Sequence, residues 1–433
     1  MGCCKCNYIN KQDNTNNNEK NNEIIVDLKE KDNNINNILK FEMKDDKDMI
    51  DLEAETLVYK FNSNRFPNST ILIGLANIGA FAYMNPILQC LSNTDKLTNY
   101  FLNEFKCDKD DDTKKVSYQY YDLLQHLWGK YNETKEYAPN NFEKLLSEIN
   151  PLFSGKNPVY SKDFLNYLLE ILHKELNEAS KEEEINNMNN VDDIKQNEEK
   201  IKQYFFKDFA KKNKSIISDL FCFSFETKSQ CSICNFIKCN FGVNYFLDFP
   251  LEQINQYLYE QGKNPTLNKA DGSNRDINLY DCFYYYDKKG IIDRDNKIYC
   301  NACNSYYDSD YSTTIYSLPE ILVINLDRGE NEVYQCNVNF PEELDLTKYV
   351  INTKLNTKYE LYGVICHIGP NHLNGYIVAY CRNRMDDKWY LYNDSIVTLC
   401  ENSYEYRDKM PYILFYKSKN INNNTQNNAY MNI

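Results

Sequence analysis

The stretch GLANIGAFAYMNPILQCL, residues 74–91, opens the folded part of the chain. The residues from Tyr83 to Asn93 have the apolar spacing of a helix, and so does Asp163–Leu176. Later segments such as YSLPEILVINLDR, YELYGVICHI, GYIVAYCR, KWYLYND and PYILFYKSK are short, rich in β-branched or aromatic residues and often alternating, which is typical of strands. Helices followed by antiparallel strands predict an α+β fold.

Composition limits the classes of partner. The 433 residues can form one large domain or two to three ordinary ones. The net charge of −14 would repel phosphate backbones, so we expect no nucleic acid partner and a preference for a basic protein face. No run of eighteen apolar residues is present, and no secretory segment follows Met1. The 16 cysteines are therefore expected to be reduced thiols plus one metal site in an intracellular, cytoplasmic protein.

Polar segments border the predicted domain. Residues 1–70 are expected to be a mostly disordered arm, because residues 7 to about 55 are rich in Asn, Lys and Asp. A polar insertion covers about 180–200, and a disordered tail is expected over 419–433. The folded domain is thus predicted over 71–418.

Two CxxC pairs, Cys231/Cys234 and Cys300/Cys303, predict a metal site. Four thiolates can hold one tetrahedral Zn²⁺ at about 2.3 Å, and four-Cys sites of this kind are structural. The alternative is four unligated core cysteines.

The opening stretch resembles the Cys box of the ubiquitin-specific proteases, usually GLxNxGNTCYMNSxLQ. Further segments resemble family motifs in the family's order. They are DFLNYLLEILHKELN, SIISDLFCFSFETKSQCSIC, IYCNACNS, LPEILVINLDRG, and the region YELYGVICHIG, GYIVAYCRN and WYLYNDSIV. The resemblance implies a papain-like thumb, palm and fingers architecture that holds ubiquitin and threads its C-terminal tail between thumb and palm. The fingers, with a zinc ribbon, would cover about 222–312.

The resemblance also implies a damaged catalytic site. Ala82 stands at the nucleophile position and Tyr376 at the base position. A methyl group cannot form a thiolate, and an ordinary phenol with a pKa of about 10 is a poor base at neutral pH. Asn77 matches the oxyanion-stabilising residue, Asn393 the residue that orients the base, and Asp394 the acid beside it.

Substitutes for the missing groups are few. Cys90 lies on the order of 12 Å along the helix from position 82, whereas attack needs about 3–3.5 Å. Cys366 and Cys381 are expected to be buried strand thiols. His372 is the nearest alternative base, and His367 is expected to be a packed side chain.

The tail channel differs from the family pattern as well. Tyr160 stands where a carboxylate usually contacts the ubiquitin tail, while Asp163 keeps the acid before Phe164. Phe81 adds bulk beside position 82. These residues predict a narrowed channel, with neutral change after loss of catalysis as the alternative.

The amino terminus, MGCCKC, resembles a dual-acylation signal. Gly2 would accept myristate after removal of Met1, and Cys3, Cys4 or Cys6 would accept palmitate. Two chains anchor a protein stably on a membrane, whereas one binds only weakly. The alternative is a disordered end whose cysteines have no role.

Three functions fit these observations. The first is an inactive family member that binds ubiquitin or a ubiquitinated partner, at a membrane face if it is acylated. The second is an active deubiquitinase that uses displaced residues. The third is a membrane-tethered interaction scaffold without ubiquitin affinity.

Overall fold

The computed structural model describes most of the region predicted to fold. The described residues are 24–26, 72–79, 83–109, 111–128, 135–154, 159–179, 198–264, 276–287, 289–292, 297–300, 302–329, 334–353, 356–371, 374–402, 405–407 and 409–419. The expected disordered arm and tail fall almost wholly outside these residues. None of the described helices has the length and apolar character needed to cross a bilayer.

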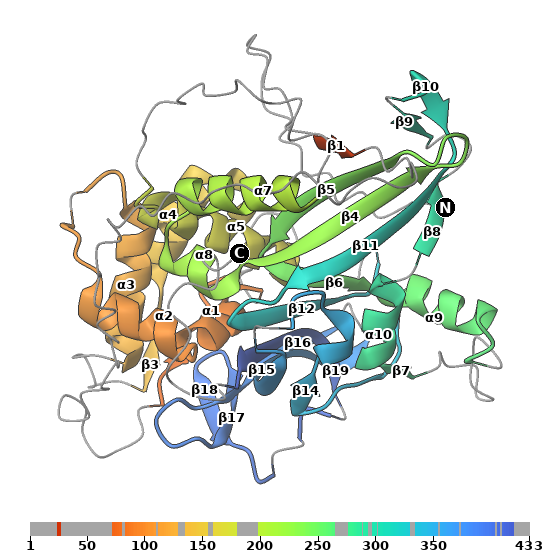
Figure 1. Cartoon of the computed structure of the whole chain (residues 1–433). Helices are drawn as coiled ribbons and strands as arrows, with labels where there is room; N and C mark the ends of the chain where they lie inside the picture. Colours follow the sequence, from red (N-terminus) through yellow and green to blue (C-terminus); the bar gives the residue numbers. More distant parts are fainter. Residues whose placement is uncertain are drawn as a thin grey trace.

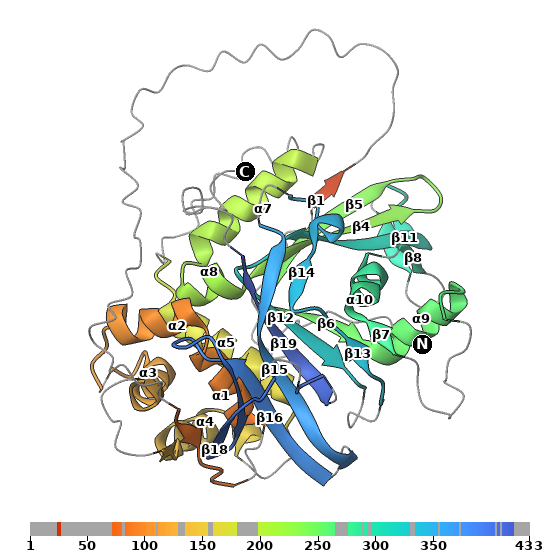
Figure 2. The ribbon, with the colours of Figure 1, turned by 90° about the horizontal axis from the view of Figure 1, so that it is seen from below.

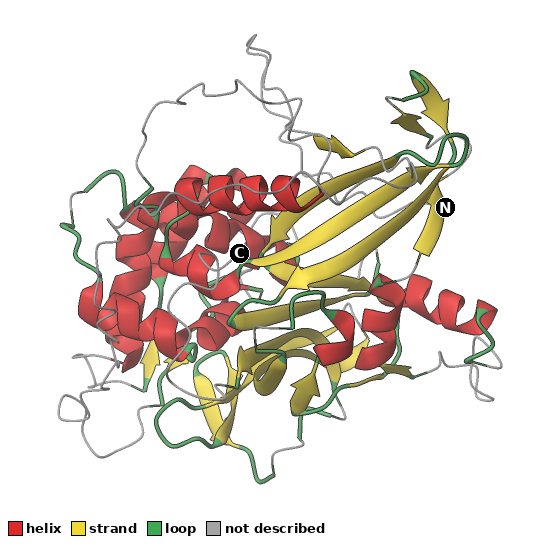
Figure 3. Cartoon of the chain, in the orientation of Figure 1, coloured by secondary structure: helices red, strands yellow, loops and turns green. Residues whose placement is uncertain are grey.

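The described chain is mixed helix and strand, with most helices gathered on one side and two further helices lying beside the strands on the other (Figure 3). The α-helices are α1 Met84–Ser92, α2 Asp95–Asn99, α3 Lys115–Trp128, α4 Asn140–Ile149, α5 Ser161–Leu176, α7 Glu198–Lys212, α8 Ile216–Phe221, α9 Leu251–Glu260 and α10 Leu279–Tyr286. Early strands are β1 Ile24–Val26, β2 Gly74–Leu75, β3 Glu136–Tyr137, β4 Phe223–Cys231, β5 Ile237–Asn244, β6 Phe246–Pro250, β7 Ile277–Asn278, β8 Lys289–Ile292, β9 Ile298–Cys300 and β10 Ser305–Tyr307. Later strands are β11 Ser309–Ser317, β12 Ile321–Asp327, β13 Val338–Asn339, β14 Glu343–Asp345, β15 Lys358–Asn371, β16 Asn374–Arg382, β17 Trp389–Asn393, β18 Ile396–Leu399 and β19 Met410–Ser418.

The α+β prediction is confirmed, and both predicted helices are present. Helix α1 lies within the predicted range, and α5 begins two residues earlier than predicted, after the extended residue Tyr160. Its predicted stripe is fully buried: Phe164, Leu168, Leu169 and Leu172. Helix α7 begins at Glu198, so the last residues of the predicted polar insertion are helical.

An eight-stranded sheet, here called the main sheet, separates two cores (Figures 1 and 2). Its order is β18-β17-β16-β15-β19-β12-β6, and β14 also pairs with β15. Alternate residues of its strands face opposite sides, so Val323 and Ala379 pack with helices α1, α3 and α5, whereas Ile324 and Val378 pack with α9 and α10. Both faces are therefore covered, which explains the nearly continuous apolar runs in the late strands.

A second sheet, the outer sheet, extends away from the main sheet with the order β1-β5-β4-β11-β8. The β9–β10 hairpin lies at its far end (Figure 1). Strand β1 comes from the amino-terminal arm and pairs antiparallel with β5, with Ile25 opposite Lys238. The interval 222–312 also contains β6, α9 and α10, which belong to the main sheet and its second core, because β6 pairs in parallel with β12.

Candidate functional site

Hydrogen bonds join the opening stretch to the turn between β17 and β18. Asn77 donates from Nδ2 to Oδ2 of Asp394 over 3.2 Å, and Asn85 donates to Oδ1 of the same carboxylate over 2.8 Å. Buried Asn85 also donates to the carbonyl oxygen of Leu75 over 3.2 Å. Two of the three polar residues expected at the site, Asn77 and Asp394, are therefore brought together across 317 positions of sequence.

The backbone reinforces this junction. The amide of Leu75 donates to the carbonyl oxygen of Asp394 over 2.9 Å. Asp394 has φ 51°, in the left-handed region that Asp tolerates better than most residues. Gly74 lies so close to the same turn that a Cβ there would stand 2.3 Å from the carbonyl oxygen of Ser395.

This close approach gives a first prediction. Gly74→Ala is expected to force β2 away from the β17–β18 turn and to lower the free energy of unfolding by about 1–3 kcal/mol, as overpacking does. Urea denaturation followed by tryptophan fluorescence measures the loss. Ser395→Ala is the control, because it changes the side chain of the contacted residue and leaves the contacted backbone in place. A Gly74→Ala variant as stable as wild type would show that the junction is loose.

Residues Phe81 and Ala82 lie outside the described part of the chain, so their predicted roles rest on the sequence. Tyr376 is the third residue of β16, pairs with Ile368 of β15 and is 64% exposed. The register pairs Ala379 with Tyr392. One residue further along each strand, Val378 falls opposite Asn393, and Tyr376 lies two residues from Val378 on the same face of the sheet. By this alternation Asn393 and Tyr376 share a face of the sheet, and their expected roles stay predictions.

The thiols near this region are buried. Cys90 of α1 and Cys381 of β16 are fully buried with their sulfur atoms 3.6 Å apart. Burial, together with the neighbouring Cys381, raises the pKa of Cys90, and burial raises the pKa of Cys366. Thiols held in the protonated form inside a core are poor nucleophiles. The prediction that Cys366 and Cys381 are buried strand thiols is confirmed.

The histidines give no alternative base within the described residues. His367 is 7% exposed on β15 and its ring lies 6.4 Å from that of Tyr412, as expected for a packed side chain. His126 stacks on Tyr137, and His173 lies within hydrogen-bond distance of Ser215. His372 falls outside the described residues.

The start of α5 carries the predicted channel residues. Tyr160 immediately precedes the helix and is 39% exposed. Asp163 lies in the first turn, where burial and the carboxylates of Asp248 and Asp327 raise its pKa against the opposing effect of Lys162. Lys162 contacts both of those carboxylates.

The two CxxC pairs converge at the far end of the outer sheet. Their four sulfur atoms lie within 4.8 Å of one another, and those of Cys234 and Cys300 are 3.5 Å apart. Four sulfurs around one Zn²⁺ would be about 3.8 Å apart, so the donor set fits the ion. Although burial opposes it, the amides of Cys234 and Ile233 lower the pKa of Cys231. Asn235 and Asn304, each following the second cysteine of a pair, adopt positive φ and turn the chain around the site.

A second group of potential ligands is already neutralised by a protein cation. Glu198, Glu226 and Cys239 lie within 4.8 Å of one another. The ammonium of Lys228 lies 2.7 Å from the Glu198 carboxylate and 3.2 Å from that of Glu226. This group is therefore an ion-pair network between α7 and the outer sheet.

Comparison with known proteins identifies the family. The family model described as Ubiquitin carboxyl-terminal hydrolase matches residues 73–416. The chain belongs to the ubiquitin carboxyl-terminal hydrolase family. In that family's terms the helical layer is the thumb, the main sheet the palm and the outer sheet the fingers, as the resemblance implied.

The relatives share low but extensive identity. Human ubiquitin carboxyl-terminal hydrolase 2 is 28% identical over 357 residues, covering 80% of this chain and 55% of the relative. Ubiquitin carboxyl-terminal hydrolase 5 of Saccharomyces cerevisiae is 25% identical over 389 residues, covering 82% and 46%. The chain thus spans about half the length of these relatives.

A solved structure shares the fold. The SAGA DUB module of Ubp8, Sgf11, Sus1 and Sgf73 bound to monoubiquitin contains a chain that superposes with a TM-score of 0.56 at 21% identity. The match covers 81% of this chain and 70% of that chain.

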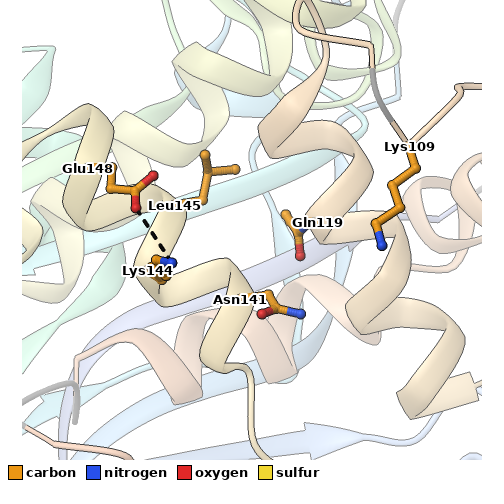
Figure 4. A pocket seen from close by; sticks show the side chains of 6 residues that line it. All are labelled: Lys109, Gln119, Asn141, Lys144, Leu145 and Glu148. Atoms are coloured by element: carbon orange, nitrogen blue, oxygen red, sulfur yellow. Dashed lines mark ion pairs between the residues drawn. The ribbon is translucent and has the colours of Figure 1, made fainter.

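A surface depression in the thumb has no part in this site. It lies between α3 and α4, where Lys144 and Glu148 form an exposed ion pair at 4.0 Å (Figure 4). Its lining residues are Lys109, Gln119, Asn141, Lys144, Leu145 and Glu148. None of them touches the junction at Asp394.

Two residues of the site, Asn85 and Lys162, were not predicted from the sequence. Asn85 lies in the quoted stretch, but nothing in its spacing shows that it would contact Asp394. Lys162 carried a usable signal, because a cation in the first turn of a helix opposes the helix dipole.

Proposed function

We propose that this chain is a catalytically inactive ubiquitin carboxyl-terminal hydrolase homologue that binds ubiquitin or a ubiquitinated partner. The observation that carries the proposal is a preserved scaffold around two altered positions. Asn77 and Asp394 are joined, and Asn393 shares a face with Tyr376. Ala82 and Tyr376 nevertheless stand where the nucleophile and the base belong.

Burial supports inactivity over displaced catalysis. An active enzyme of this class needs an ionisable thiol in an accessible site. Cys90, Cys366 and Cys381 are fully buried, and burial raises the pKa of the first two. Ubiquitin as a partner is supported by the family and by the ubiquitin-bound structural neighbour.

Three measurements test the proposal. Calorimetric titration with ubiquitin is expected to give saturable heat, a fluorogenic ubiquitin substrate is expected to remain intact, and a ubiquitin C-terminal electrophile is expected to leave every cysteine unmodified. Electrophile capture at any cysteine would establish displaced catalysis instead. Absence of binding heat would favour an interaction scaffold without ubiquitin affinity.

The fingers cysteines are proposed to hold one structural Zn²⁺. The support is the convergence of four sulfur atoms from two CxxC pairs. When bound, the ion would join the turn after β4 to the β9–β10 hairpin, which share the small cluster of Cys231, Phe236 and Cys300. It would have no part in bond cleavage, because a four-Cys site leaves no open position.

The amino terminus is proposed to anchor the protein on the cytoplasmic face of a membrane. Gly2→Ala removes the myristate acceptor and is expected to move most of the protein from the membrane to the soluble fraction. The reason is that palmitate on the cysteines would have no myristoyl chain beside it. Fractionation of cells expressing either form measures the shift. Lys5→Ala, which keeps Gly2 and the three cysteines, is the control. Equal membrane fractions for Gly2→Ala and wild type would exclude acylation-dependent anchoring.

A further inference from the structure

Lys162 occupies a position that helix energetics disfavour. It lies in the first turn of α5, where the positive end of the helix dipole and the exposed amides favour anions. Its neighbour Asp163 follows that rule, and Lys162 breaks it. The compensation comes from another layer of the fold, since both partners of the ammonium belong to the palm.

The partners are oriented carboxylates on two adjacent strands. The ammonium of Lys162 lies 3.1 Å from Oδ2 of Asp248, the middle residue of β6, and 3.9 Å from Oδ2 of Asp327, the last residue of β12. Their other oxygens are fixed: Asn325 donates to Asp248 over 2.6 Å, and the amide of Gly329 donates to Asp327 over 2.9 Å. Lys162 therefore joins the start of α5 to two palm carboxylates whose orientation is already fixed by hydrogen bonds.

Contacts lead from this bridge to segments next to the two altered positions. Two residues after Lys162, the ring of Phe164 packs edge-on against Tyr83, which directly follows position 82. On the palm side, Asp327 precedes Arg328, which is 1% exposed and donates to the carbonyl oxygen of Pro411 on β19 over 2.9 Å. Strand β19 pairs with β15, and β15 pairs with the strand that carries Tyr376.

The charge is unbalanced at this seam, the contact between the start of α5 and the palm carboxylates Asp248 and Asp327. Among the described residues, Lys162 is the cation that pairs with Asp248 and Asp327, and Asp163 lies beside them, so acidic side chains outnumber basic ones in this group. The three ion-pairing side chains are partly accessible, at 29% for Lys162, 41% for Asp248 and 34% for Asp327. Such an ion pair is weak enough to open and sensitive to salt.

We propose that Lys162 is a clasp that ties the start of α5 to the palm carboxylates in the free protein and must be released before a partner segment can enter between them. The Lys162 side chain would thereby compete with the partner for the same site. The affinity effect rests on the proposed ubiquitin binding, whereas the closure of the seam does not.

The test compares Lys162→Met with wild type by amide hydrogen exchange and by ubiquitin titration. Loss of the charge at similar side-chain length is expected to raise exchange about two- to fivefold in 161–168, in β6 around Asp248 and at the end of β12, the range set by ion pairs of this exposure. Ubiquitin affinity is expected to rise by the same factor, because more molecules are open before binding. Raising the salt concentration is expected to bring wild type toward the variant.

Two further variants make the result specific. Lys162→Arg keeps the cation and is expected to behave as wild type. Lys115→Met removes an exposed thumb ion pair with Asp112 and is expected to leave both readouts unchanged. Unchanged exchange and unchanged or weaker binding in Lys162→Met would overturn the clasp. If neither protein binds ubiquitin, the proposed function fails, and the exchange data alone decide the clasp.

Discussion

The double variant Ala82→Cys/Tyr376→His is expected to hydrolyse ubiquitin conjugates, whereas wild type is expected not to. The cysteine supplies the missing nucleophile, and an ordinary imidazole with a pKa of about 6.5 can accept its proton near neutral pH. Strand alternation sets Asn393 on the same face as position 376, so the new histidine would lie on the same side of the sheet as the residue expected to orient it. A positioned general base contributes about 10²–10⁴-fold. We therefore expect the double variant to exceed Ala82→Cys alone by at least about 100-fold with a fluorogenic ubiquitin substrate.

Two further variants separate the effect of the missing nucleophile from that of the missing base. Ala82→Cys alone is expected to react slowly with a ubiquitin C-terminal electrophile, because only a few per cent of an unassisted thiol is ionised at pH 7. Ala82→Cys/Tyr376→Phe is the matched control, since it removes the phenol oxygen without adding a base. Equal rates for the phenylalanine and histidine double variants would mean that position 376 does not reach position 82. Hydrolysis by wild type at the rate of the double variant would contradict the inactive assignment altogether.

Removing zinc is expected to unfold the end of the fingers and leave the rest of the domain folded. Purified protein is expected to contain one equivalent of zinc, and Cys234→Ser to lose it, because a neutral hydroxyl replaces a thiolate ligand. The hydrophobic cluster at the four-Cys site is small, consisting of Cys231, Phe236 and Cys300 with a few partly buried neighbours. Amide exchange in 231–236 and 298–307 is therefore expected to rise by at least about tenfold, approaching that of locally unfolded chain.

Cys107→Ser is the control for the zinc experiment. Cys107 is a half-buried thiol in the thumb, outside the four-Cys cluster, so its loss should change neither the zinc content nor exchange in the fingers. Elemental analysis and exchange by mass spectrometry give the two readouts. Full zinc content in Cys234→Ser, or a zinc-free wild type with protected fingers, would assign these cysteines to packing alone.

Local patterns predicted much of the fold. The stripe of Phe164, Leu168, Leu169 and Leu172 predicted α5 because helical spacing puts these residues on one buried face. The late strands were predicted because β-branched and aromatic residues suit extended chain. Segment order and motif resemblance then indicated the family.

Such local patterns could not predict the contacts between distant segments. The start of α5 was placed two residues late because the apolar stripe begins only at Phe164, and the polar residues before it carry no periodicity. Strand β6 fell within the predicted fingers interval, yet it pairs with β12 in the palm. Its sequence fits either sheet, so only the pairing partner determines where it belongs.

The amino-acid sequence by itself determined which chemical groups are present: a methyl group at position 82, a phenol at 376, two CxxC pairs and a glycine at position 2. Only the tertiary structure decided which groups meet. It joined Asn77 and Asn85 to Asp394, brought four sulfur atoms together, and set Lys162 against Asp248 and Asp327. The reason is physical: side-chain chemistry is fixed by residue identity, whereas hydrogen bonds and ion pairs act over a few ångströms between residues that folding brings together from far along the chain.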